Sequence, residues 1–190
     1  MSLTEFVKSN FSTNANEHLI FYGGSFNPWH DGHTQCVSFA SQFFPVIVIP
    51  DNNPFKNQGP LEYRETSIKD IENKLVKANI KNFSIYTDFL NSNKPTPTSL
   101  WVSQLQKEFP QLKIHLLVGH DNFMQIHRWK NAEQLLNTLN GLYIVSRLGT
   151  KEEQEQQSKV LLNINTELEL KFSNNHQFEH ISSTLIREKI

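Results

Sequence analysis

Short apolar runs recur along most of this chain, and polar or charged segments separate them. Five such runs, rich in Ile, Val, Phe and Tyr, cover 19–22, 46–49, 83–86, 114–118 and 142–145. Each run is too short for a typical helix, so the pattern predicts strands that are buried on both faces of a sheet. A weaker run at 167–172, where apolar residues alternate with charged ones, predicts an edge strand.

Between these runs, apolar residues are spaced by three and four positions, as on one face of a helix. This spacing occurs within 68–75, 102–109 and 132–139. Strands that alternate with helices are typical of an α/β protein with a doubly wound parallel sheet, covered by helices on both faces. The charged and glutamine-rich run 151–159 predicts a solvated helix or loop.

The length of the chain, 190 residues, is enough for a single domain with a full core. Residues 1–17 are polar and rich in Asn and Ser. We therefore expect them to form an N-terminal extension, with room for one helical turn, that stays outside the core. The domain itself is expected to span 18–190.

Charge and cysteine content narrow the choice of partners and compartment. The formal net charge is −1, so no global positive field would recruit nucleic acid or an anionic membrane. Cys36 is the one cysteine, which suits a reducing cytoplasm. The start of the sequence lacks the apolar core of a signal peptide, and the most apolar run, 45–50, is too short to cross a bilayer. These features predict a cytoplasmic protein without a nucleic-acid or membrane partner.

The loop after the first expected strand, 23–33, reads GGSFNPWHDGH. Its glycines let the backbone approach a ligand, and a helix that begins near Asp31 would offer N–H groups and a positive dipole end to an anion. His30 and His33 would share one face of that helix and point toward the anion. A metal site is the alternative, because His30, His33 and Cys36 are spaced by three, although no fourth ligand is evident.

A second candidate phosphate site lies in the segment 181–187, which reads ISSTLIR. Ser182 or Ser183 is a suitable helix N-cap, and a serine-rich helix start again offers N–H groups to a phosphate. Arg187, one helical turn further on, would reach the same anion.

The two segments resemble motifs of one family. The loop is similar to the GGSFNPxHxGH string of the nicotinate and nicotinamide mononucleotide adenylyltransferases, and 181–187 resembles their ISSTxIR motif, which closes over the ATP phosphates. The resemblance implies a single Rossmann-like domain that transfers an adenylyl group from ATP to a pyridine mononucleotide in NAD biosynthesis, with release of pyrophosphate. It implies Mg²⁺ bound through the ATP phosphates rather than by protein ligands, and it leaves a homo-oligomer possible.

The resemblance also assigns roles to residues. Catalysis falls to His30, His33, Lys56 and Arg187. ATP binding falls to Gly23, Gly24, Ser25, Phe26, Gly119, Asp121, Ile181, Ser182 and Ser183. Mononucleotide binding falls to Asn27, Thr96, Trp129 and Arg147. Within these sets Asp121, in a GHDN segment that resembles the family's GxDN, would bind the ATP ribose. Trp129 would stack on the pyridine ring; the other interpretation of Trp129 is a core residue.

The chain departs from the family pattern at two places that bear on its substrates. His120 stands where a small residue is usual and would narrow the adenosine pocket, and 96–100, TPTSL, replaces a segment that helps to hold the pyridine substrate. Two alternatives therefore stay open: another phosphorylated acceptor, such as a pantetheine or flavin precursor, and a nucleotide-binding regulator without turnover. The choice between nicotinate and nicotinamide mononucleotide is also open.

Overall fold

The computed structural model describes residues 1–12, 17–51, 61–91, 96–145 and 150–174, without the side chains of 61–67 and of Asn91. Within these ranges the chain forms a parallel sheet of six strands in the order β3-β2-β1-β4-β5-β6. The strands are β1 (His18–Gly24), β2 (Val46–Pro50), β3 (Phe83–Ile85), β4 (Lys113–Gly119), β5 (Gly141–Val145) and β6 (Glu169–Phe172). All six predicted strands are confirmed, and β6 lies at an edge as its alternating pattern predicts.

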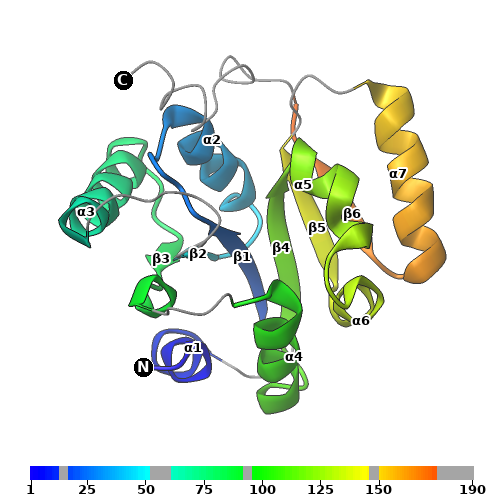
Figure 1. Ribbon diagram of the computed structural model, residues 1–190, viewed down its shortest axis with the longest axis horizontal. Coiled ribbons are helices and arrows are strands. Elements are labelled where there is room, and N and C mark those ends of the chain that lie inside the picture. The colour runs from blue at the N-terminus through cyan, green and yellow to red at the C-terminus, as the bar shows by residue number, and fades with distance from the viewer. Residues whose placement is uncertain (13–16, 52–60, 92–95, 146–149, 175–190) are drawn as a thin grey trace.

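Helices cover both faces of this sheet (Figure 1). Helices α2 (Asp31–Ala40) and α3 (Leu61–Lys77) pack on one face. The other face carries α1 (Leu3–Asn10), α4 (Thr98–Glu108), α5 (His120–Gln125), α6 (Ala132–Thr138) and α7 (Lys151–Ile164). Two 3-10 helices, η1 (Asp88–Asn91) and η2 (Ile126–Arg128), lie in the connections. The doubly wound α/β architecture is therefore confirmed.

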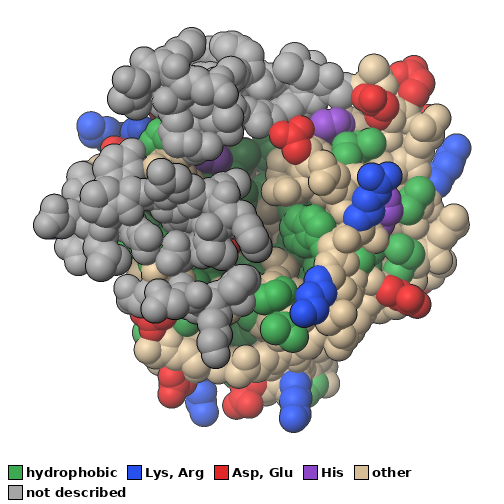
Figure 2. Space-filling view, in the orientation of Figure 1, with side chains coloured by type: hydrophobic (Ala, Val, Ile, Leu, Met, Phe, Trp, Pro, Cys, Tyr) green, Lys and Arg blue, Asp and Glu red, His purple; other side chains and the backbone are tan. Residues whose placement is uncertain are grey.

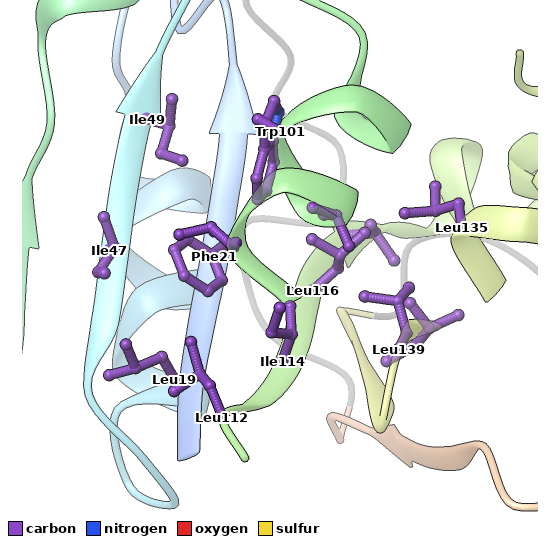
Figure 3. Close-up of a cluster of buried hydrophobic side chains, with 14 of the residues drawn as sticks. Leu19, Phe21, Ile47, Ile49, Trp101, Leu112, Ile114, Leu116, Leu135 and Leu139 are labelled. Carbon is purple, nitrogen blue, oxygen red and sulfur yellow. The ribbon is translucent and has the colours of Figure 1, made fainter. Parts of the chain in front are cut away.

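The strands bury alternate residues in two separate layers of the core. Leu19 and Phe21 of β1 face α4, whereas Ile20 and Tyr22 face α2 and α3. The first layer appears in Figure 3, where Trp101 of α4 packs against Phe21 with ring centroids 5.4 Å apart. Because both faces of the central strands are apolar, the sheet is specified by short continuous hydrophobic runs rather than by alternation.

The N-terminal residues correct one expectation. Helix α1 is not a polar lead-in, because Leu3, Phe6 and Val7 are buried in the layer that contains α4. The side chain of Ser2 caps the helix by accepting a hydrogen bond from the Glu5 backbone N–H at 3.2 Å. Residues 3–10 thus belong to the core, and the expectation that 1–17 stays outside it is wrong for this helix.

The strand order places a change of direction between β1 and β4. The chain leaves β1 for α2 on one face and leaves β4 for α5 on the opposite face. In an open parallel sheet this arrangement separates the two following helices and creates a crevice beyond the carboxyl ends of the two strands. The segments 23–33 and 119–121 follow the carboxyl ends of β1 and β4, where such a crevice is expected.

Candidate active site at the carboxyl ends of β1 and β4

The loop after β1 brings His30 and His33 together at the start of α2. His30 is the N-cap residue with extended backbone angles, and His33 is the third residue of the helix. The two imidazole rings stack with centroids 3.8 Å apart and an angle of 27° between their planes. The prediction that both histidines share one face at the helix start is confirmed.

The hydrogen bonding of His33 favours one tautomer. The backbone N–H of His30 donates to Nδ1 of His33 at 3.4 Å. A ring nitrogen that accepts a hydrogen bond carries no proton, so in the neutral ring the proton sits on Nε2. His33 then offers an N–H donor on the side of the ring away from the backbone.

An aromatic cluster beneath the loop fixes the position of His33. The rings of Phe26 and Trp29 each lie 5.1 Å from the His33 ring, and Tyr22 packs against Phe26 at 4.8 Å. The indole N–H of Trp29 donates to the Thr34 hydroxyl at 2.9 Å. Trp29 is 2% exposed and was not among the expected site residues, although a tryptophan inside a polar ligand-binding loop was a signal for a supporting role.

The side chain of Phe26 packs beneath the loop and does not face a ligand at its surface. Its side chain is buried, and its backbone φ of 44° is in the left-handed region that bulky residues rarely adopt. A Cβ added to Gly24 would lie 2.9 Å from the Phe26 ring, so a glycine is needed beside it. Any contact of Phe26 with ATP would come from its backbone. The neighbouring Ser25 and Asn27 are half-buried in the same loop.

Two glycines leave open space at the strand ends. A Cβ built on Gly23, the next-to-last residue of β1, or on Gly119, the last residue of β4, meets no atom within 4 Å beyond its chain neighbours. Asp121 follows in the first turn of α5, and its side chain is exposed. The predicted ATP-binding residues Gly23, Gly119 and Asp121 therefore lie at or just beyond the carboxyl ends of two neighbouring strands.

The predicted mononucleotide-binding residues are more scattered. Thr96 is half-buried and precedes α4, which begins after Pro97. Trp129 follows η2 and is partly buried against the core layer that contains α4. The remaining predicted site residues lie outside the described ranges: Lys56, Arg147, Ile181, Ser182, Ser183 and Arg187.

A buried glutamine holds the segment that leads to Trp129. Gln157 of α7 is 4% exposed, and its amide nitrogen lies 2.8 Å from the Phe123 carbonyl oxygen, to which it donates, and 3.0 Å from Nδ1 of His127. These contacts tie α7 to α5 and η2. The run 151–159 forms part of a surface helix, as expected. Its glutamine-rich composition gave no indication that Gln157 would be buried.

Neither a metal cluster nor a membrane span is found in the described ranges. No three His, Cys, Asp or Glu side chains there are grouped so as to hold a metal ion, so His30, His33 and Cys36 do not form a three-ligand site. Cys36 is buried in the core beside α3 instead. None of the described helices is long and apolar enough to span a bilayer. In Figure 2, the coloured Lys and Arg side chains are scattered among Asp and Glu rather than gathered in one patch.

Comparison with known proteins agrees with this arrangement. Residues 21–189 match the cytidylyltransferase-like family. The chain is 30% identical over 141 residues to a Helicobacter pylori protein named "probable nicotinate-nucleotide adenylyltransferase", a match that covers 72% of this chain and 78% of the relative. A Bacteroides fragilis protein of the same name is 28% identical over 142 residues, which cover 71% of this chain and 68% of the relative.

A solved structure has the same fold. The Plasmodium falciparum nicotinic acid mononucleotide adenylyltransferase, solved in complexes with APC and with NaAD, superposes with a TM-score of 0.70. The superposition covers 91% of this chain and 83% of that one at 20% sequence identity, so it bears on the fold. With a family match over most of its length, the chain belongs to the cytidylyltransferase-like family and, within it, to the nicotinate-nucleotide adenylyltransferases, which are nucleotidyltransferase enzymes.

Proposed function

We propose that this enzyme transfers the adenylyl group of ATP to nicotinate mononucleotide, forming the dinucleotide and releasing pyrophosphate. The observation that carries the proposal is the stacked pair His30 and His33 at the start of α2, beside the open ends of β1 and β4. The names of the relatives support nicotinate rather than nicotinamide mononucleotide as the acceptor.

The reaction needs no nucleophile from the protein. A phosphate oxygen of the mononucleotide attacks the α-phosphorus of ATP in line, the new P–O bond forms, and the bond to pyrophosphate breaks. Catalysis then rests on positioning and on hydrogen bonds that strengthen as charge moves onto the phosphates. The Nε2–H of His33 and the start of α2 supply such donors, with the ring held in place by Phe26 and Trp29.

Other expected residues complete this proposal. Lys56 and Arg187 neutralise the leaving pyrophosphate, Arg187 with its bidentate guanidinium, while Ile181, Ser182 and Ser183 close over the phosphates. Gly23, Gly24, Ser25 and Phe26 contact ATP through the loop backbone. Asn27, Thr96, Trp129 and Arg147 bind the mononucleotide.

Magnesium fits this site as a partner of the substrate. Mg²⁺ usually keeps several waters and binds phosphate oxygens rather than a cage of protein ligands, and the described residues provide no group of three ligands. When bound, it supplies charge neutralisation on the triphosphate. The protein side chains orient the triphosphate around it.

The deciding experiment measures pyrophosphate release by the purified protein with ATP and magnesium. Nicotinate mononucleotide, nicotinamide mononucleotide, phosphopantetheine, flavin mononucleotide and no acceptor are compared in parallel. We expect release with nicotinate mononucleotide at a kcat/KM well above that with the others. Release with phosphopantetheine or flavin mononucleotide alone would identify another acceptor. ATP binding without release from any of them would indicate a nucleotide-binding regulator.

A further inference from the structure

His120 is a buried polar residue whose position in the fold is unexplained by packing alone. It is the first residue of α5, directly after Gly119, and is 8% exposed. Its Nδ1 is fully enclosed and has no hydrogen-bond partner among the residues that the structure describes. Because buried polar groups in native proteins are nearly always hydrogen-bonded, a histidine enclosed in this way needs an explanation beyond packing.

The enclosure of Nδ1 indicates which ring nitrogen of His120 carries the proton. A buried N–H without an acceptor is rarer in proteins than a bare lone pair without a donor. The favoured neutral tautomer therefore leaves Nδ1 bare inside the protein and places the proton on Nε2. Because Nδ1 is enclosed, Nε2 is the ring nitrogen left for a ligand. His120 thus presents a single N–H donor.

The crevice has two sides of different electrostatic character. On the β1 side, the start of α2 and the His30–His33 pair favour the negatively charged phosphates. On the β4 side, the exposed carboxylate of Asp121 lies in the first turn of the short helix α5. A carboxylate repels phosphate, so the uncharged nucleoside of ATP belongs on the β4 side, where Gly119 leaves open space.

The donor and the carboxylate suit different parts of a nucleoside. A carboxylate only accepts hydrogen bonds, so it pairs with hydroxyl donors such as those of the ribose. The N–H of His120 needs an acceptor, and the ring nitrogens of adenine accept without donating. The two neighbouring residues can therefore bind the sugar and the base of one adenosine.

We propose that His120 is a specificity-determining residue that donates a hydrogen bond from Nε2 to a ring nitrogen of the adenine of ATP. This inference rests on the proposed function, because it concerns the nucleotide of the same site. It assigns a role to the residue that departs from the small side chain usual at this position in the family.

Three substitutions separate hydrogen bonding from packing. His120→Gln brings an amide N–H close to the position of Nε2, His120→Asn brings one close to Nδ1, and His120→Phe keeps a ring without a donor. We expect His120→Phe and His120→Asn to raise the KM for ATP about 3- to 10-fold, as for the loss of one neutral hydrogen bond, while His120→Gln recovers most of the affinity. The KM for the mononucleotide should stay close to that of the wild type.

The base contact is tested with 1-deaza-, 3-deaza- and 7-deaza-ATP, each of which lacks one ring nitrogen. One of these analogues should bind the wild type more weakly than ATP does, by the same factor by which His120→Phe weakens ATP binding. The His120→Phe variant should bind that analogue and ATP equally well. The proposal would be overturned if His120→Phe bound ATP as tightly as the wild type. Equal affinity for ATP in His120→Asn and His120→Gln would also overturn it. So would equal discrimination by the wild type and His120→Phe against all three analogues. Thermal unfolding of each variant identifies losses that come from misfolding.

Binding of ATP and its analogues, measured by calorimetry without acceptor, keeps this test separate from that of the reaction. Absent pyrophosphate release with the expected pattern of analogue binding would reject the proposed function and retain the role of His120. Normal pyrophosphate release without discrimination among the ATP analogues would retain the proposed function and reject the role of His120.

Discussion

His33 owes its position to three neighbours rather than to the helix alone. The His30 backbone holds Nδ1, and Phe26 and Trp29 pack against the ring. A donor that is fixed before the reaction stabilises developing charge without reorganisation. We therefore expect His33→Ala to lower kcat by about 10²- to 10³-fold, as for other single donors to a transition state, with a much smaller change in ATP affinity.

Steady-state kinetics together with ATP binding by calorimetry checks this expectation. Thr34→Val, which removes the acceptor of the Trp29 indole but keeps His33, is the matched control and should lower kcat far less. Near-normal turnover in His33→Ala would remove His33 from the mechanism.

Two glycines at strand ends make opposite predictions for the same change. Gly119→Ala adds a methyl group in open space beside the crevice, so we expect normal stability and a raised KM for ATP. In Gly141→Ala the new Cβ would lie 2.8 Å from Nδ1 of His115 and 3.0 Å from the Glu169 carbonyl oxygen. Crowding of this kind should cost about 1–3 kcal/mol of stability.

Urea unfolding and ATP binding of both variants provide the measurement. Unchanged ATP binding in Gly119→Ala would show that the nucleotide does not approach the end of β4. Full stability in Gly141→Ala would show that His115 can move aside.

The sequence predicted residues of the site where local chemistry marks them. Glycines and histidines in one loop indicate an anion site, and the structure brings His30 and His33 together. Gln157 was missed because its partner, the Phe123 carbonyl, is 34 residues away along the chain. Trp29 was missed although its partner Thr34 lies in the neighbouring helix start, only five residues away. No pattern along one chain reveals that the partner of Gln157 is the Phe123 carbonyl.

At the scale of elements, α7 contacts the segment that leads to Trp129 through one buried side chain, Gln157. Gln157→Leu removes the donor to the Phe123 carbonyl oxygen and to His127. A buried carbonyl left without its donor costs about 1–3 kcal/mol, so we expect the free energy of unfolding to fall by that amount. Because η2 leads to Trp129, the KM for the mononucleotide should rise more than the KM for ATP.

The neighbouring Gln156, exposed on the same helix, offers the control. Gln156→Leu should leave both the stability and the two KM values close to those of the wild type. If Gln157→Leu lowers stability without any change in the KM for the mononucleotide, α7 stabilises the fold but does not position the binding segment.

Strands were easier to predict than the first helix, and the reason is physical. Central strands are buried on both faces and therefore read as continuous apolar runs. Helix α1 buries only Leu3, Phe6 and Val7, which are spaced by three and four inside a polar segment. The spacing of these three residues can be seen in the sequence, but the many Asn and Ser residues of 1–17 favoured a polar extension. Burial against Tyr86 and α4 is a tertiary effect that composition does not report.

At the scale of the whole molecule, the amino ends of the strands carry a second histidine pair. Nδ1 of His18 on β1 lies 3.0 Å from Nε2 of His115 on β4, and the Phe44 ring stacks on both imidazoles. Burial, and then the charge of His18, lowers the pKa of His115 from 6.5 to about 3. Burial and Lys113 also lower the pKa of His18.

These shifts predict how stability depends on pH. Between pH 6.5 and about 3 the unfolded chain binds a proton at His115 that the folded protein does not. The free energy of unfolding should therefore fall as the pH drops through this window, by up to about 1.4 kcal/mol per pH unit from this residue. Urea unfolding at pH 7, 6 and 5 measures the slope. His115→Leu should flatten it, and an unchanged slope in that variant would assign the effect to other groups.

The parallel arrangement of the strands keeps the two histidine pairs at opposite edges of the sheet, His30 and His33 beyond its carboxyl edge and His18 and His115 near its amino edge. The sequence can consequently change at one edge with little effect on the other. Substitutions that replace His18 and His115 with apolar residues would make the protein more tolerant of acid while leaving its chemistry intact. Sequence changes among relatives can thus alter stability at low pH and substrate choice independently.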